Sequence, residues 1–341
     1  MTRSFWFLLI CAGCGAPCGG EATTPAPWYD SRGPVPAVTT STVAVGEVGD
    51  RTWRTGAQAT FLPTSAVERD TFARVIPEIL AAVRGKAADP KAFAAPLAAA
   101  GFTLEVWQVG GKSYWVLLED PARRRGAGAY LFRLGPPQPE EILLQAPHAD
   151  YDVGTGDISA QLFFAPPPGN APRALFLNTI HRYQVTPGQR ERRPGSPADV
   201  AHNPDHLYAH ATEAALTAGP MLVVQVHGFG TRSDDDGDDD DVPAGTTMIV
   251  SAGRETGSTP RSTAVAAALR RRFGDGVRRF PEDVSVLGAT TNVQGRAARS
   301  RAGDFVHVEI AASLRKQLRD GGAPLQQLGE ALFDTPVAEA R

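Results

Sequence analysis

Cysteine is nearly absent from this chain of 341 residues, and all three cysteines lie at or before position 18. Disulfide bonds therefore do not hold the main part of the fold together, and its stability must come from a packed core. The apolar stretch near the start, "FWFLLI", is far shorter than the roughly 20 residues needed to span a bilayer. The formal net charge is −3 and no basic stripe with interleaved aromatic residues is present, which argues against nucleic acid as a partner.

Two common hydrolase motifs are also missing. The elbow G-x-S-x-G of the α/β-hydrolases would need glycine at the first position of "IVSAG", where Ile249 stands. The zinc-protease motif H-E-x-x-H would need glutamate directly after His206, where Leu207 stands. These absences disfavour a serine esterase. His206 and His210 are expected to be polar residues of an ordinary amphipathic helix, and the alternative is a structural metal site there.

The first 20 residues are typical of an export signal rather than of a folded segment. Arg3 and the apolar stretch are followed by small residues and by "AGC", a pattern that resembles a bacterial lipoprotein signal in which Cys14 is acylated. Cys11, three residues before it, is atypical for such a signal, and the alternative is a plain secretory signal. Either signal takes the protein out of the cytoplasm, and a lipid on Cys14 would anchor it to a membrane of the cell envelope. Residues 21–46, rich in proline and threonine, are expected to be a tether.

Residues 47–140 are expected to form a small α+β module. Helical spacing predicts helices over 64–84, with a kink or break at Pro77, and over 90–100. Three alternating segments follow and predict an antiparallel meander. They are residues 102–109, 113–120 and 128–134. No cluster of nucleophile, base and metal ligands occurs here, so a packing or recognition role is expected.

Residues 141–341 differ because their apolar runs are continuous, as in strands that are buried on both faces. Helices are expected over 204–217, with Asn203 as N-cap, and over 261–273. The alternation predicts an α/β fold with an open, mostly parallel (mixed) sheet and helices on both faces. The apolar runs lie at 174–180, 221–226, 247–251, 284–288 and 305–310.

Polar residues follow these runs at their ends. His148, His181 and His227 each come directly after an apolar run, and Glu309 lies near the end of another. Ligands bind at the carboxyl ends of the strands in such sheets, so we expect these side chains to share one cleft.

A metal ion is one ligand that such residues suit. Two imidazoles and a carboxylate with an open fourth position are the usual pattern of a catalytic zinc site. His148 and His227 would supply the imidazoles, while Asp150, Asp152 and Asp157 are rival carboxylates among which spacing does not choose. In the alternative interpretation, these acids only cap backbone amides of the loop.

Four more residues are candidates for catalysis or substrate binding. Burying the Glu309 carboxylate at the end of an apolar strand costs free energy unless the group is paired or functional, and it would serve as a general base. Arg182 suits a substrate carboxylate, and Asn292 and Arg296 suit polar substrate groups. The alternatives are a salt bridge between Glu309 and an arginine such as Arg182, and plain loop hydrogen bonds for the others. The acidic segment 234–241 lacks the EF-hand glutamate and is expected to be a solvated loop over the cleft.

Four segments, "APHADYDVGTGD", "RALFLNTIHRY", "VVQVHGF" and "FVHVEIAASLR", occur in this order within residues 145–318. With them the chain resembles the N-formylglutamate amidohydrolase-like group within the zinc-carboxypeptidase-type folds. The resemblance implies one zinc ion, held by His148, a nearby carboxylate, for which we choose Asp152, and His227. It also implies Glu309 as the base and Arg182 as the anchor for a carboxylate.

The expected function is a zinc-dependent hydrolase at the cell envelope. It would cleave an amide or peptide bond in a small substrate that bears a carboxylate, such as an acyl-amino acid or a peptide fragment. The alternative is a non-catalytic envelope lipoprotein that keeps the fold and binds a peptidic or wall-derived ligand. An intact set of His148, His227 and Glu309 favours the enzyme.

Overall fold

A computed structural model of the chain describes residues 37–85, 89–193, 195–230, 241–301 and 303–336. Cys14, and the acidic segment except for Asp241, lie outside the described residues. The helices are α1 (Val48–Arg51), α2 (Ala66–Arg84), α3 (Lys91–Ala99), α4 (Thr155–Phe164), α5 (Leu207–Thr217), α6 (Pro260–Phe273), α7 (Val293–Ser300), α8 (Ala312–Arg319) and α9 (Gly322–Phe333). The strands are β1 (Thr39–Thr42), β2 (Phe102–Val109), β3 (Lys112–Glu119), β4 (Ala129–Arg133), β5 (Ile142–Ala146), β6 (Ala174–Leu177), β7 (Gln184–Thr186), β8 (Gln189–Arg190), β9 (Leu222–Phe229), β10 (Met248–Ser251), β11 (Val277–Arg279) and β12 (Phe305–Ala311).

Ten of these strands form one mixed sheet, in the order β1-β2-β3-β4-β6-β5-β9-β12-β10-β11. The centre, β6-β5-β9-β12, is parallel. The meander β2-β3-β4 is antiparallel, as expected, and β10 runs antiparallel to β12. The predicted α/β class with a mixed sheet is confirmed.

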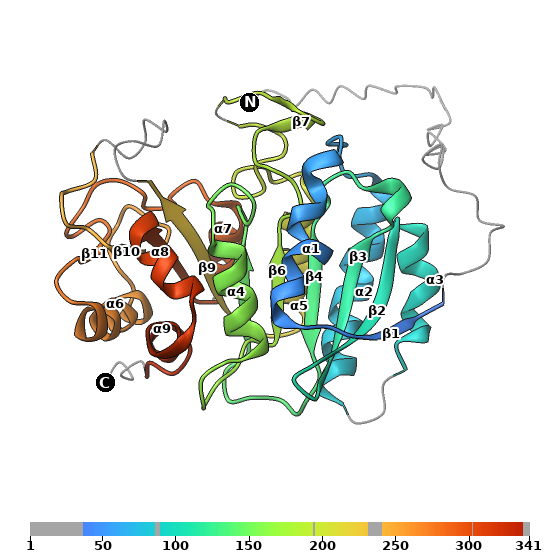
Figure 1. The fold of residues 1–341 in the computed structure, drawn as a ribbon, viewed down its shortest axis with the longest axis horizontal. Coiled ribbons are helices and arrows are strands. Elements are labelled where there is room, and N and C mark those ends of the chain that lie inside the picture. The colour runs from blue at the N-terminus through green and yellow to red at the C-terminus, as the bar shows by residue number, and fades with distance from the viewer. Residues whose placement is uncertain (1–36, 86–88, 194, 231–240, 302, 337–341) are drawn as a thin grey trace, which may run out of the picture.

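Helices cover both faces of the sheet, as the sequence predicted (Figure 1). One core contains apolar residues of α1, α4, α6, α8 and α9, and the other contains those of α2, α3, α5 and α7. Strand β9 shows the division, because Val224 and Val226 face the first core whereas Val223 faces the second. A strand buried on both faces explains the continuous apolar runs.

The N-terminal elements extend the same sheet rather than forming a sheet of their own. β4 pairs with β6 across the expected domain boundary at residue 140, which falls in the loop between β4 and β5. The expected tether also ends before residue 46, because Thr39–Thr42 forms β1 and pairs with β2. Threonine is β-branched, and such residues favour an extended strand at a sheet edge.

Helix α2 starts at Ser65, whose side chain accepts a hydrogen bond from the backbone of Glu68 in a capping box. The helix continues through Pro77 without ending there. Proline removes one backbone hydrogen bond, which costs about 3 kcal/mol in a helix interior. The neighbouring Ile76, Ile79 and Leu80 are fully buried in the second core, and this burial offsets the loss.

Two sequence predictions in the C-terminal half are wrong. Residues 284–288 are not a strand, because Leu287 lies at φ 56°, outside the strand region, and Val284 is buried in a small cluster with Phe280. Helix α5 begins after His206, whose side chain accepts from the backbone of Tyr208, so Asn203 is not its N-cap. Among the described residues, no helix is both long and apolar enough to cross a membrane.

A close contact between the short 3-10 helix Trp53–Gln58 and the segment after β6 leads to a prediction about stability. A Cβ atom on Gly56 would lie 1.5 Å from the backbone oxygen of Thr179. The Gly56→Ala variant must therefore move backbone, and we expect it to lose about 1–3 kcal/mol of unfolding free energy, as is typical of overpacked sites. Urea unfolding would measure the loss. Gly46→Ala is the control, since nothing lies within 4 Å of its Cβ position; equal midpoints for both variants would contradict the prediction.

Candidate metal centre

A cavity of about 950 Å³ opens at the carboxyl ends of β5, β9 and β12. His148, His227 and Glu309 all line it, so the structure brings these three predicted residues together. His181 is buried beside Tyr151, with ring centroids 5.0 Å apart, and does not line the cavity.

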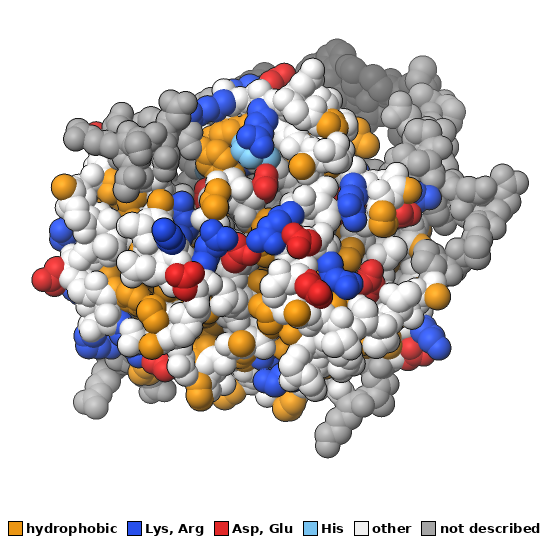
Figure 2. All heavy atoms as spheres, viewed as in Figure 1, with side chains coloured by type: hydrophobic (Ala, Val, Ile, Leu, Met, Phe, Trp, Pro, Cys, Tyr) orange, Lys and Arg blue, Asp and Glu red, His pale blue; other side chains and the backbone are white. Residues whose placement is uncertain are grey.

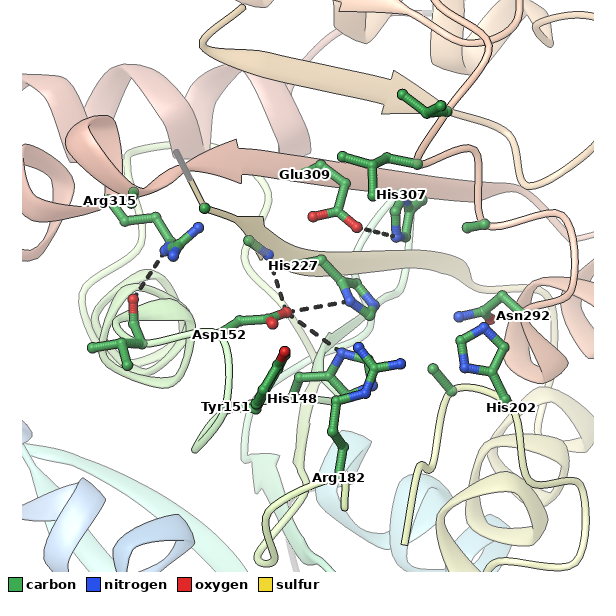
Figure 3. A pocket seen from close by; sticks show the side chains of 18 of the residues that line it. His148, Tyr151, Asp152, Arg182, His202, His227, Asn292, His307, Glu309 and Arg315 are labelled. Carbon is green, nitrogen blue, oxygen red and sulfur yellow. Dashed lines mark hydrogen bonds and ion pairs between the residues drawn. The ribbon is translucent and has the colours of Figure 1, made fainter. Parts of the chain in front are cut away.

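His148, Asp152 and His227 form a compact buried cluster in this cavity (Figure 3). Oδ2 of Asp152 lies 3.5 Å from Nδ1 of His148 and 3.4 Å from Nδ1 of His227. The turn after β5 creates this arrangement, because the Asp152 amide donates to the His148 carbonyl at 2.8 Å. Gly154, at φ 98°, then allows the chain to enter α4.

The geometry of the cluster fits a tetrahedral metal ion. Ligand atoms at about 2.0–2.2 Å from a tetrahedral zinc ion lie about 3.4 Å from each other. The observed separations of 3.4 and 3.5 Å match this edge, and they are too long for good hydrogen bonds. A carboxylate that faces two imidazole nitrogens suits a shared cation.

Asp199 holds His148 from the other side. Its Oδ1 lies 2.9 Å from Nε2 of His148, and its Oδ2 accepts hydrogen bonds from Arg182 and lies 3.1 Å from Nδ1 of His202. If His148 donates Nε2–H to Asp199, its Nδ1 lone pair faces Asp152. A carboxylate behind a ligating histidine is the usual support of a zinc site. Sequence reasoning missed Asp199, which lies in an irregular segment without periodicity.

Burial and charge favour the protonation states that a metal needs at Asp152 and His227, but not at His148. Burial, against the nearby Asp152 carboxylate, lowers the pKa of His227 to about 4, so this imidazole is neutral near pH 7. Burial alone would raise the pKa of Asp152, but His148 and His227 outweigh it and hold that pKa well below its usual range. For His148, burial and Arg182 lower the pKa, whereas Asp199 and Asp152 raise it, and the net pKa is raised. A cation bound at Nδ1 would replace that proton.

Glu309 lies next to His227, because the two residues are partners in the parallel register of β12 and β9. His307, two residues before it on β12, lies on the same side of the strand, and Nε2 of His307 is 3.5 Å from Oε1 of Glu309. His227, His307 and Glu309 form a second group close enough to hold a metal. The first group fits better, since the outer Nε2 atoms of both its histidines have acceptors, Asp199 for His148 and Gln225 for His227.

Of the rival carboxylates, only Asp152 belongs to a possible metal cluster among the described residues. Asp157 is instead bound by Arg54 at 2.7 Å and by Arg319 at 3.3 Å. Figure 2 shows basic and acidic side chains side by side across this face, over α8, α4 and α1. Asp157 is therefore engaged in surface ion pairs and does not line the cavity.

The predicted substrate-binding residues have different places. Arg182 lines the cavity and pairs with Asp199 rather than with Glu309, and its guanidinium lies over the rings of Tyr151 and Tyr183, 5.3 and 5.0 Å from their centroids. Asn292 lines the cavity but is the N-cap of α7, where its Oδ1 accepts from Gly295.

Arg296 lies outside the residues that line the cavity, and its guanidinium donates to the Thr291 carbonyl at 2.7 Å. Ser251, the serine of "IVSAG", is fully buried, donating to the Gly288 carbonyl and accepting from the Gly253 amide. It is not placed to act as a nucleophile, in agreement with the missing elbow motif.

Asp199 gives a prediction about metal affinity. In the Asp199→Ala variant, His148 loses the acceptor of its Nε2–H, so we expect zinc affinity to fall about 10- to 100-fold, as for other supporting residues of this kind. Competition with a chromogenic chelator would measure the affinity. The exposed Asp205→Ala is the control. An unchanged affinity in Asp199→Ala would show that Asp199 does not support the metal.

No protein-family model and no curated protein matches the chain. Among solved structures it is similar to a bacteriophage poly-gamma-glutamate hydrolase, with 15% identity, 58% of this chain and 84% of that chain covered, and a TM-score of 0.35. It is also similar to a metallo-carboxypeptidase from Burkholderia cenocepacia, with 11% identity, 62% of this chain and 61% of that chain covered, and a TM-score of 0.40. A third similar structure is the N-formylglutamate amidohydrolase from Ralstonia eutropha JMP134, with 14% identity, 57% of this chain and 95% of that chain covered, and a TM-score of 0.34.

A metallo-carboxypeptidase and an N-formylglutamate amidohydrolase, the two kinds of protein named from the sequence, are thus among the solved structures similar to this chain. At these identities and TM-scores the similarities do not assign a role to any residue. The assignment of each residue therefore rests on the geometry of the cavity.

Proposed function

We propose that the protein is a zinc-dependent hydrolase that cleaves an amide or peptide bond in a small substrate bearing a carboxylate. The supporting observation is the buried Asp152 carboxylate, which faces the Nδ1 atoms of His148 and His227 at 3.5 and 3.4 Å in an open cavity. Three protein ligands leave one position of a tetrahedral ion for water or substrate, as in catalytic zinc sites. This is the reaction class that the sequence resemblance implied.

Each residue of the site has a distinct role in this reaction. His148, Asp152 and His227 would hold the ion, which would supply Lewis-acid chemistry that polarises a carbonyl group and makes water more acidic. Glu309, on the strand beside His227, takes the proton from water as the water oxygen attacks the carbonyl carbon. It then delivers this proton to the leaving nitrogen, so the carboxylate is regenerated at the end of the cycle.

Arg182 would hold the substrate carboxylate at the wall of the cavity. Its guanidinium is kept in place by Asp199 and by the rings of Tyr151 and Tyr183. A planar guanidinium is suited to a carboxylate, and immobilising it in advance reduces the entropy lost on binding. A substrate without a free carboxylate would lose this contact.

Zinc analysis of the full chain is the direct test. We expect about one zinc ion per chain, hydrolysis of N-acyl amino acids that stops after chelation, and recovery when zinc is restored. The same substrates with the carboxylate converted to a carboxamide are the matched control and should be cleaved more slowly. A chain that binds no zinc after reconstitution would refute the proposal. Zinc binding without hydrolysis of any of these substrates would favour a ligand-binding lipoprotein.

We also propose that the protein works at the cell envelope, anchored through a lipid on Cys14. Support comes from the "AGC" sequence after a short apolar stretch. Mass spectrometry of the N-terminal peptide would detect the acyl chains. The Cys14→Ser variant should lose them and leave the membrane fraction, and an unmodified Cys14 would refute the anchor.

A further inference from the structure

A buried chain of polar side chains lies next to His227, between the sheet and helices α5 and α7. Its members are Gln145 on β5, Gln225 on β9, Thr212 on α5, and Asn292 and Gln294 at the start of α7. Each is 2% exposed or less. Buried amides must be hydrogen-bonded, and the direction of each bond follows from its partner.

The chain ends at three backbone groups whose roles are not ambiguous. Nε2 of Gln294 lies 2.7 Å from the carbonyl oxygen of Val200, which can only accept. The Thr212 hydroxyl likewise donates to the Tyr208 carbonyl at 2.9 Å. In contrast, Oδ1 of Asn292 receives the backbone N–H of Gly295, which can only donate, at 2.8 Å.

These ends fix the orientation of the neighbouring amides. Because Gln294 donates to Val200, its oxygen faces Gln225 at 3.1 Å. The Thr212 hydroxyl already donates to Tyr208, so it accepts from Nε2 of Gln145 at 2.8 Å. The oxygen of Gln145 therefore faces Gln225, at 2.7 Å. The oxygens of Gln294 and Gln145 thus both contact the same end of the Gln225 side chain. Because both are acceptors, that end must be the donor Nε2.

The third end gives the same orientation independently. Because the Asn292 oxygen accepts from Gly295, its Nδ2 faces Gln225 and donates to Oε1 at 2.8 Å. The same Oε1 lies 3.3 Å from Nε2 of His227. Side-chain amides are usually assigned by comparing alternative hydrogen-bond networks. Here three independent backbone ends require that Gln225 present oxygen to His227.

We propose that Gln225 is a positioning residue that fixes the tautomer of His227. It accepts the hydrogen of Nε2, so the lone pair of Nδ1 points toward Asp152 and the cavity. His148 is oriented by the carboxylate of Asp199, whereas His227 is oriented by a neutral amide that the fold holds in one direction. The value of this for metal binding rests on the proposed function, but the tautomer itself does not.

The test uses nuclear magnetic resonance of the full chain labelled with ¹⁵N-histidine and stripped of metal. We expect His227 to show hydrogen on Nε2 and a lone pair on Nδ1. In Gln225→Met, which keeps the shape but lacks the acceptor, we expect both tautomers, and zinc affinity about 10- to 100-fold lower. Thr212→Val is the control, because it removes a buried hydrogen bond of the same chain while the ends at Val200 and Gly295 still orient Gln225.

The outcomes separate this inference from the proposed function. Hydrogen on Nδ1 of His227 in the parent protein, or an unchanged tautomer in Gln225→Met, would overturn it. If Gln225→Met fails to fold, the spectra of the parent and of Thr212→Val still test the inference, since hydrogen on Nδ1 of His227 in either protein would overturn it. A parent protein with this tautomer but without zinc affinity would refute the metal centre and leave the role of Gln225 intact.

Discussion

The His227→Ala variant is expected to purify without zinc and to show no amide hydrolysis above background. The change removes one of the three proposed ligands and leaves a pair, His148 and Asp152, that would bind zinc weakly in water. It also removes the partner that faces Asp152 at 3.4 Å. Zinc content should therefore fall from about one ion per chain to background, as measured by elemental analysis, and His148→Ala should behave in the same way.

His210→Ala is the matched control for these variants. His210 lies on α5, half-buried, outside both possible metal clusters. This variant should keep its zinc and its activity. If His148→Ala and His227→Ala both retained stoichiometric zinc, the ion would lie elsewhere and the assignment of the cavity would be wrong.

Glu309→Gln is expected to keep its zinc and to lose about 10²- to 10⁴-fold in kcat, the usual contribution of a general base. The carboxamide has nearly the same shape as the carboxylate but does not take up a proton. Glu213→Gln, an exposed change on α5, is the control and should leave kcat unchanged.

The zinc content of Glu309→Gln also decides between the two possible clusters. If the ion were held by His227, His307 and Glu309, the variant would lose zinc together with activity. Retained zinc with low kcat would place Glu309 opposite the ion as a base. Retained zinc with normal kcat would exclude it from the chemistry.

Sequence reasoning reached the residues that follow strands. His148 and Glu309 could be singled out because a polar side chain at the end of an apolar run needs a reason, and parallel strands end at one edge. Asp199 could not, since it lies in an irregular segment and contacts His148 only through the tertiary fold. Gln225 was equally hidden, because an amide within a buried strand reveals its partners only when its neighbours in space are known.

The errors have physical causes as well. Residues 284–288 look like a strand because they are apolar, yet composition does not distinguish a strand from a buried loop. Asn292 was predicted to bind substrate, and it does line the cavity, but its role as the N-cap of α7 was not predicted. Helix starts were predicted less accurately than strands, and this affected the roles that were expected for loop residues.

The register between β9 and β12 has a consequence for how such a protein evolves. His227 and Glu309 are aligned partners, so the sheet's own spacing of about 4.8 Å keeps them adjacent. Insertions in the connecting segments would leave this pair in place, as long as the two strands keep their alignment. The rim of the cavity can therefore change toward new substrates while His227 and Glu309, the proposed ligand and the proposed base, stay next to each other.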